Sequence, residues 1–132
     1  MKRTKKIIFY TIIGLSVLGI PVFAFPGRQH EILRIDVVFE GGRWSEKTPL
    51  VADACARLFK SGTQKLSAFE LDDAIDFLGG TIKATAFYDS FTVSLYTLTK
   101  NLEASLVLLK VCLEEIVFPE HELDIHRDNA LS

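Results

Sequence analysis

Residues 49–63 read PLVADACARLFKSGT, and this stretch with its flanking segments indicates the fold. Its apolar side chains recur at a spacing of three and four residues, which predicts a helix. These side chains are Leu50, Val51, Ala54, Cys55, Leu58 and Phe59. Thr48 and Pro49 supply a capping residue and a proline at the first helical position. On the opposite face Asp53 and Arg57 are four residues apart, so we expect an ion pair between them, worth roughly 0.2 to 0.5 kcal/mol.

The flanking sequence predicts an antiparallel sheet and further helices. Residues 32–40, ILRIDVVFE, alternate between an apolar and a mixed face, as a half-buried strand does. Residues 81–88 and 90–99 are typical of two strands joined by a short turn, hence of an antiparallel hairpin. Helical patterns cover residues 67–78, 102–116 and 120–132. Because strands and helices arrive in groups, we expect an α+β fold with helices packed on one face of a largely antiparallel sheet.

Two of these helices have predicted caps and predicted buried stripes. Ser67 and Glu70 have the spacing of a capping box, and Asn101 is expected to cap the helix that follows it. The buried stripe of the first helix is expected to contain Phe69, Leu71, Ala74, Ile75 and Leu78. That of the second is expected to contain Leu106, Leu109, Leu113 and Ile116, widened by Val107 and Val111.

The composition is that of an ordinary globular protein. The chain has 132 residues, of which 48% are hydrophobic and 24% are charged, enough for one compact core. The formal net charge is -2, which argues for neither a nucleic acid nor an acidic substrate, and the sequence has no basic patch interleaved with aromatic residues that would suggest base stacking. Cys55 and Cys112 lie on apolar faces of predicted helices without a CxxC spacing, and we interpret them as small buried thiols.

Residues 1–25 form a basic and then apolar segment with more than one interpretation. Four basic residues precede an uncharged run over residues 7–25, and Val22-Phe23-Ala24 resembles a signal-peptidase site. A signal peptide or a membrane anchor would place the protein at the cell envelope, periplasmic or membrane-anchored. Alternatively residues 19–25 form the first strand of the domain that follows, and the protein is cytoplasmic. Cleavage after Ala24 would leave 11 basic against 17 acidic residues, a formal charge of -6.

Four short motifs give the sequence a family resemblance. They are Phe39-Glu40-Gly41-Gly42-Arg43-Trp44, Leu58-Phe59-Lys60-Ser61-Gly62-Thr63, Ser67-x-x-Glu70-Leu71 and Gly79-Gly80. In this order they resemble the N-terminal half of a pitrilysin/insulinase-type metallopeptidase domain, the family that includes the mitochondrial processing peptidase subunits. The resemblance covers residues 19–132. It implies a partial domain over residues 26–132, because the family's domain is considerably longer.

The resemblance also implies that the family's catalytic motif is missing. In catalytic members the helix bears an inverted zinc motif, His-x-x-Glu-His, a fixed step before the turn at Gly62-Thr63. Aligned from that turn, the two His positions fall on Asp53 and Arg57, and the Glu position falls on Ala56. Zinc hydrolysis needs neutral imidazole ligands and a carboxylate base, so this chain is expected to hold no metal and to be no enzyme. The cofactor zinc would be expected only in a catalytic partner.

Three further groups of polar residues are candidates for substrate or metal binding. In the resembling family, strands near Tyr88 and Asp89 line a chamber that holds peptide substrate, so these two residues are candidate substrate-binding residues; the alternative is a turn with a packed aromatic side chain. Asp72, Asp73 and Asp76 are interpreted as a solvated helical face, because calcium needs about six to eight oxygen ligands. His121 and His126 are five residues apart and point about 140° apart on a helix, which predicts a solvated charged face and no metal site.

The resemblance favours a non-catalytic subunit or fragment that pairs with a catalytic pitrilysin-like homologue and helps to form a peptide-binding chamber. One alternative is a degenerate zinc metallopeptidase, which would have to tolerate Arg57 beside the cation. Another is an envelope-anchored structural or interaction protein, in which membrane contact through residues 1–25 matters more than the domain.

Overall fold

The computed structural model describes residues 31–131. The predictions of a signal peptide, an anchor or a first strand within residues 1–25 lie outside the described residues. Within residues 31–131, no helix combines the length and the apolar character needed to cross a bilayer. The elements follow one another as β1 (Ile32–Glu40), α2 (Val51–Leu58), α3 (Ala68–Phe77), β2 (Thr81–Ala86), β3 (Ser90–Leu98), a 3₁₀ turn η1 (Thr99–Asn101), α4 (Leu102–Glu114) and α5 (Glu120–Leu131).

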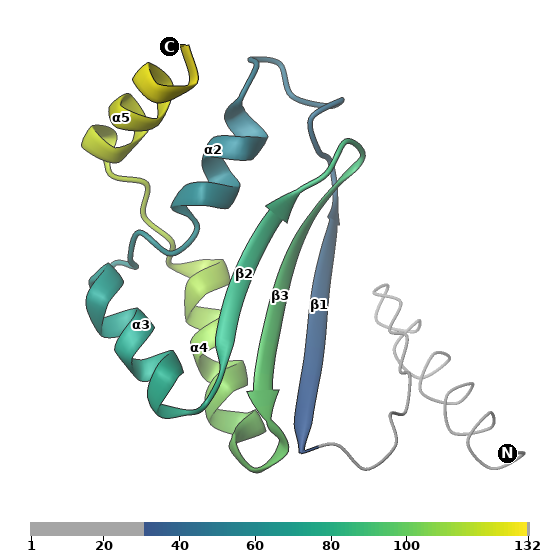
Figure 1. The fold of residues 1–132 in the computed structure, drawn as a ribbon, viewed down its shortest axis with the longest axis vertical. Coiled ribbons are helices and arrows are strands. Elements are labelled where there is room, and N and C mark those ends of the chain that lie inside the picture. Colours follow the sequence, from purple (N-terminus) through teal and green to yellow (C-terminus); the bar gives the residue numbers. More distant parts are fainter. Residues whose placement is uncertain (1–30, 132) are drawn as a thin grey trace, which may run out of the picture. The chain divides into compact units, whose positions relative to one another are not determined.

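The three strands form one antiparallel sheet in the order β1-β3-β2 (Figure 1). In the register, Phe39 pairs with Phe91 and Glu40 with Ser90 at one end of β1, while Ile82 pairs with Leu95 on the other side of β3. The predicted strand over residues 32–40 and the predicted hairpin are both confirmed. The fold class is therefore the expected one, α+β with an antiparallel sheet.

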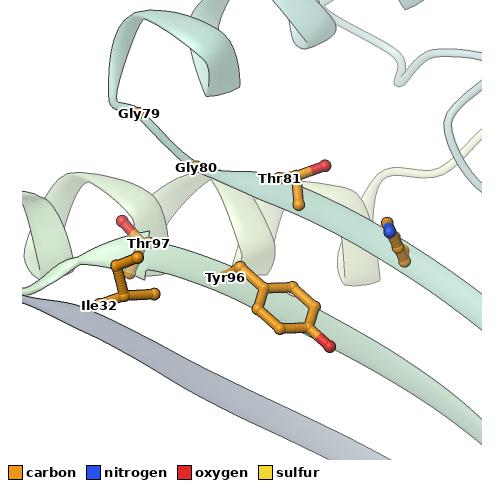
Figure 2. A pocket seen from close by; sticks show the side chains of 7 residues that line it. Ile32, Gly79, Gly80, Thr81, Tyr96 and Thr97 are labelled. Carbon is orange, nitrogen blue, oxygen red and sulfur yellow. The ribbon is translucent and has the colours of Figure 1, made fainter. Parts of the chain in front are cut away.

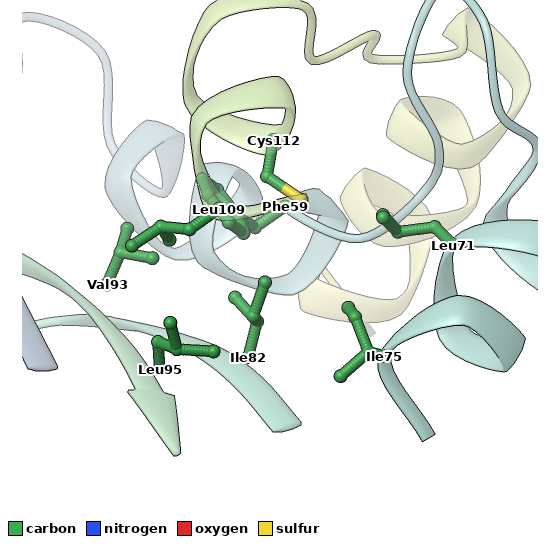
Figure 3. Packing of buried hydrophobic residues seen from close by; sticks show 8 residues of the cluster. All are labelled: Phe59, Leu71, Ile75, Ile82, Val93, Leu95, Leu109 and Cys112. Carbon is green, nitrogen blue, oxygen red and sulfur yellow. The ribbon is translucent and has the colours of Figure 1, made fainter. Parts of the chain in front are cut away.

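The core lies between one face of the sheet and helices α2, α3 and α4. Figure 3 shows its buried side chains, which are Phe59, Leu71, Ile75, Ile82, Val93, Leu95, Leu109 and Cys112. They come from β2, β3, the end of α2 and the inner faces of α3 and α4. Because alternate residues of a strand point to the same face, burial of Ile82, Val93 and Leu95 places all three helices on that face.

The beginnings of two helices show how far local sequence determines a cap. At α3 the capping box is confirmed, because the Ser67 hydroxyl accepts from the Glu70 N–H and the Glu70 carboxylate accepts from the Ser67 N–H. At α2 the predicted cap is wrong. The helix begins at Val51 after Leu50, whose φ is +74°, and the Glu46 carboxylate accepts from the backbone N–H groups of Leu50 and Ala52. A carboxylate from the preceding loop therefore replaces the predicted capping residue.

The predicted buried stripes are partly wrong. In α3, Leu71 and Ile75 are buried as expected, whereas the side chain of Phe69 is 80% exposed. In α4 the buried residues are Ser105, Leu109 and Cys112, while Leu106 and Val107 are exposed. The inner face of α4 is set by a hydroxyl pair, because Thr97 Oγ1 on β3 lies 2.6 Å from Ser105 Oγ in a buried position. Leu109 of the predicted stripe is buried, and Leu113 and Ile116 pack against the core while partly exposed.

Asn101 does not cap α4 with its side chain. Its amide nitrogen instead donates to the carbonyl oxygen of Leu78, at 2.8 Å, and so ties the start of α4 to the end of α3. The two thiols also differ from each other: Cys112 is fully buried as predicted, but Cys55 is only half-buried.

Candidate functional site

The loop after β1 is joined to the tip of the β2–β3 hairpin through the backbone. The N–H groups of Gly41, Arg43 and Trp44 donate to the carbonyl oxygens of Asp89, Phe87 and Tyr88, at 3.2, 3.0 and 2.8 Å. Gly42 is required there, since a Cβ atom at this position would lie 2.3 Å from the Phe87 carbonyl oxygen. Figure 1 shows the hairpin tip and this loop at the same end of the sheet. The contact holds Arg43 and Trp44 beside the start of α2.

Asp53 lies at the centre of a cluster of charged side chains on α2. Its carboxylate is 3.4 Å from Arg57 Nε, which confirms the predicted intrahelical ion pair, and 3.3 Å from Arg43 Nη2. Both guanidinium groups are partly exposed, with side-chain exposures of 44% for Arg43 and 67% for Arg57. Ala56, on the same helix, is half-buried and carries no polar group. The structure therefore brings Asp53 and Arg57 together and adds Arg43, which the sequence did not single out.

His126 of α5 also approaches Asp53. Its Nε2 atom lies 3.8 Å from Asp53 Oδ2 and has no hydrogen-bond partner, and the side chain is only 9% exposed. The prediction that His126 belongs to a solvated face is therefore wrong, although His121 and Glu122 are exposed as predicted. The reason is tertiary: α5 packs on α2, and helical periodicity alone does not reveal which face a neighbouring helix will cover.

Tyr88 is linked to the Asp53 cluster through Arg43. The Arg43 Cζ atom lies 5.7 Å from the centroid of the Tyr88 ring, and the Trp44 ring stacks on Tyr88 with centroids 5.7 Å apart and planes tilted by 37°. Asp89 is engaged locally, since its Oδ1 atom accepts from the Ser90 hydroxyl. The assignment of Tyr88 and Asp89 as substrate-binding residues stays a prediction. Trp44, which the sequence did not suggest as a candidate, lies beside Tyr88 because its backbone N–H donates to the hairpin tip.

Two pockets open on the surface, one of them beside the loop before α2. The first has a volume of about 350 Å³ and lies at the turn between α3 and β2, where Ile32, Thr81, Tyr96 and Thr97 surround it (Figure 2). The second has a volume of about 450 Å³ and is mainly apolar. It is lined by Phe39, Gly41, Gly42, Ser45, Glu46, Val51, Ala52, Cys55, Phe59, Phe91, Leu113, Ile116 and Phe118. Phe39 and Phe91, which line the second pocket, are paired across β1 and β3. This pairing depends on the strand register, so the sequence alone did not predict the pocket.

Neither thiol is suited to act as a nucleophile. Burial raises the pKa of the Cys55 thiol above its usual value, and burial raises the pKa of Cys112 to about 11. Both thiols are therefore protonated at neutral pH, whereas the thiolate is the reactive form.

The side chains around Asp53 do not fit a catalytic zinc ion. Such an ion takes three protein ligands, usually His with a carboxylate or thiolate. Here Asp53 offers oxygen and His126 offers nitrogen, but two guanidinium groups contact the same carboxylate. Within residues 31–131, no group of three His, Cys, Asp or Glu side chains could hold a metal ion. Electrostatic repulsion from Arg43 and Arg57 opposes a divalent cation at Asp53.

Comparison with solved structures identifies related folds. One is the crystal structure of a peptidase M16 inactive domain from Pseudomonas fluorescens, with a TM-score of 0.69 and 19% sequence identity over 78% of this chain. Another is a protease from Helicobacter pylori, with a TM-score of 0.67 and 24% identity over 76% of this chain. The matched region is 26% of the Pseudomonas chain and 25% of the Helicobacter chain, so this chain spans about a quarter of their length.

These two likenesses, at under 25% identity, concern the fold alone. No curated protein matches the chain. The family model described as insulinase (peptidase family M16) matches residues 28–132, most of the sequence. This span includes the loop at Gly42, helix α2 and the hairpin described above, and the chain belongs to the insulinase family of M16 peptidases.

Proposed function

We propose that the chain is a non-catalytic member of the insulinase family, which pairs with a catalytic homologue and helps to form a peptide-binding chamber. The observation that carries the proposal is the contact of Asp53 with the guanidinium groups of Arg43 and Arg57. In catalytic members the two zinc-binding imidazoles occupy the positions of Asp53 and Arg57. Here an ion pair replaces them, and Ala56 replaces the carboxylate that would take a proton from water.

The ion pairs support a structural use of these positions. Asp53 connects α2 to the loop through Arg43, and it approaches α5 through His126. A carboxylate in contact with two cationic groups has little to gain from a metal ion, because binding the ion would require both pairs to separate. The description of the Pseudomonas structure as an inactive domain agrees with this proposal at the level of the fold. The zinc ion of the assembly would then belong to the catalytic partner.

The proposal also includes a peptide and a location. Tyr88 at the hairpin tip and Trp44 in the loop before α2 are both exposed, and we expect them to contact a peptide in the chamber. The basic and apolar character of residues 1–25 favours the cell envelope as the location, with contact to a membrane through that segment. If residues 19–25 form a strand instead, the location would be cytoplasmic.

The test is recovery of the tagged chain from its native host, followed by mass spectrometry of the intact bait and its companions. The expected companion is a homologue with an intact His-x-x-Glu-His motif, and the bait mass shows whether residues 1–24 are removed. Recovery of the bait without a catalytic homologue would contradict the proposal.

Zinc content provides a second test, aimed at the degenerate-peptidase alternative. The purified chain is expected to contain far less than one equivalent of zinc and to cleave no peptide in a chelator-sensitive manner. We also expect the triple variant Asp53→His, Ala56→Glu, Arg57→His not to regain proteolysis by itself, because Arg43 would still place a positive charge beside the site. Zinc-dependent cleavage by the unmodified chain would contradict the non-catalytic assignment.

A further inference from the structure

The loop before α2, helix α2 itself and the hairpin tip together present a surface of aromatic rings and guanidinium groups. It consists of Arg43, Trp44, Arg57 and Tyr88, and we refer to it as the Trp44 surface. We infer that the Trp44 surface binds a peptide segment in which a carboxylate side chain stands next to an apolar side chain. The inference rests on the proposed function, because it names the class of peptide that this chain contacts in the chamber.

The aromatic part of this surface is open to a ligand. Trp44 is 78% exposed and Tyr88 is 60% exposed, although the two rings are stacked on each other. Aromatic side chains presented in this way supply a large apolar contact area at a low cost in conformational entropy. Tryptophan, tyrosine and arginine are also the residues most enriched among those that dominate binding energy at protein interfaces.

The charged part of the surface has donors to offer to a carboxylate. Asp53 contacts Nη2 of Arg43 and Nε of Arg57, and these three groups together carry one net positive charge. A guanidinium group has five N–H donors in a planar fork, more than its contact with Asp53 engages. Such a group binds a carboxylate with two parallel hydrogen bonds, and Asp53 holds both guanidinium groups in position for this.

The positive charge of the Trp44 surface is local. Residues 31–132 contain 10 basic and 17 acidic residues, so the molecule around the surface is acidic. Two further carboxylates close by in the sequence keep their negative charge and accept local hydrogen bonds, Glu46 from backbone N–H groups at the start of α2 and Asp89 from the Ser90 hydroxyl. The guanidinium groups of Arg43 and Arg57 are therefore the positions at which a peptide carboxylate binds, while the acidic remainder of the surface repels it.

The surface is also held in place before any ligand arrives. The backbone of Arg43 and Trp44 donates two hydrogen bonds to the hairpin tip, at 3.0 and 2.8 Å. Arg43 lies over the Tyr88 ring at 5.7 Å, a cation–π contact that keeps the guanidinium beside the aromatic pair. Little ordering is then required on binding, which favours affinity.

Trp44 provides a direct measurement, because it is the one tryptophan of the sequence. The probe is a short peptide without tryptophan in which two glutamates flank a phenylalanine, titrated into the full chain while tryptophan fluorescence is recorded. Replacing both glutamates by glutamine in the peptide is expected to weaken binding about tenfold, because charge-assisted hydrogen bonds become neutral ones. This comparison leaves the protein unchanged, so it does not depend on the folding of any variant.

A matched pair of variants locates the binding. Arg34 makes the same kinds of contact as Arg43, since its Nε atom lies 2.9 Å from Asp36 Oδ1 and its Cζ atom lies 5.3 Å from the Tyr96 ring centroid. Arg43→Gln is expected to weaken binding of the glutamate peptide about tenfold, and Arg34→Gln to change it less than about twofold. Far-UV circular dichroism confirms that both variants are folded.

Equal binding of the glutamate and glutamine peptides, or equal losses in the two variants, would overturn the inference. These results are independent of the pairing proposal, because the titration uses the chain without a partner. Capture of a catalytic homologue together with equal binding of the two peptides would refute the peptide class alone. Selective binding of the glutamate peptide without any captured homologue would refute the pairing alone.

Discussion

Replacing Gly42 by alanine tests the junction between the loop and the hairpin. The added Cβ atom would lie 2.3 Å from the Phe87 carbonyl oxygen, 2.7 Å from the Ser90 nitrogen and 2.8 Å from the Tyr88 carbonyl oxygen. All three are backbone atoms, so no side-chain rotation can relieve the contact. The φ angle of Gly42 lies outside the left-handed region, and the effect of the substitution is therefore steric.

The expected loss of stability can be calculated from the hydrogen bonds that the substitution weakens. The loop has to move away from the hairpin tip by about 1 Å to restore ordinary van der Waals contact. That movement weakens the three backbone hydrogen bonds from Gly41, Arg43 and Trp44. At roughly 0.5 to 1.5 kcal/mol for each hydrogen bond, we expect Gly42→Ala to lower the free energy of unfolding by about 2 to 4 kcal/mol.

Urea unfolding, followed by far-UV circular dichroism and by Trp44 fluorescence, measures this change. The control is Gly79→Ala, where the φ angle is +67° and the added Cβ atom meets only the flexible side chain of Leu98, at 2.9 Å. We expect the control to cost about 1 kcal/mol, from backbone strain. A cost for Gly42→Ala below about 0.5 kcal/mol, or no larger than that of the control, would refute the steric account.

Three further predictions concern the core, a cap and a thiol. Thr97→Val should lower the unfolding free energy by about 1 to 3 kcal/mol, because it leaves the buried Ser105 hydroxyl without its partner; adding Ser105→Ala should recover much of the loss in urea unfolding. Ser67→Ala should cost about 1 kcal/mol at neutral pH by the same measurement. The backbone N–H and the hydroxyl of Ser67 both donate to the Glu70 carboxylate and lower the pKa of Glu70 below its usual value. Glu70 therefore stabilises the fold at neutral pH, and this contribution should fade on acidification; the change with pH should be smaller in Ser67→Ala, which keeps the backbone donor and loses the hydroxyl. Cys112, with a pKa of about 11, should react with a thiol reagent at mildly alkaline pH only after denaturant is added.

Local patterns in the sequence were sufficient for most of the fold. The strand at Ile32–Glu40 was predicted to the residue, because its alternation is uninterrupted and Gly41 follows it. The capping box of Ser67 and Glu70 was predicted because both partners lie within one helical turn. The ion pair of Asp53 and Arg57 was predicted for the same reason.

Features that depend on contacts between distant segments were not predicted. The side chain that caps α2 comes from Glu46, which no short-range capping pattern includes. Burial of His126 depends on the packing of α5 against α2, and the approach of Arg43 to Asp53 depends on the loop being held by the hairpin. The sequence therefore predicted the contact between Asp53 and Arg57 on α2, whereas the positions of Arg43 and His126 required the tertiary structure.

The steric requirement for glycine at position 42 comes from the fold and is independent of catalysis. This glycine belongs to one of the motifs by which the sequence resembles its family, yet what demands it is the closeness of two backbone segments. A screen of all substitutions at position 42 for correct folding should return glycine almost alone, with no substrate present. A lineage that stops hydrolysing peptides would keep this glycine for as long as it keeps the fold. The presence of this motif therefore reports the fold and the family, and it carries no information about hydrolysis.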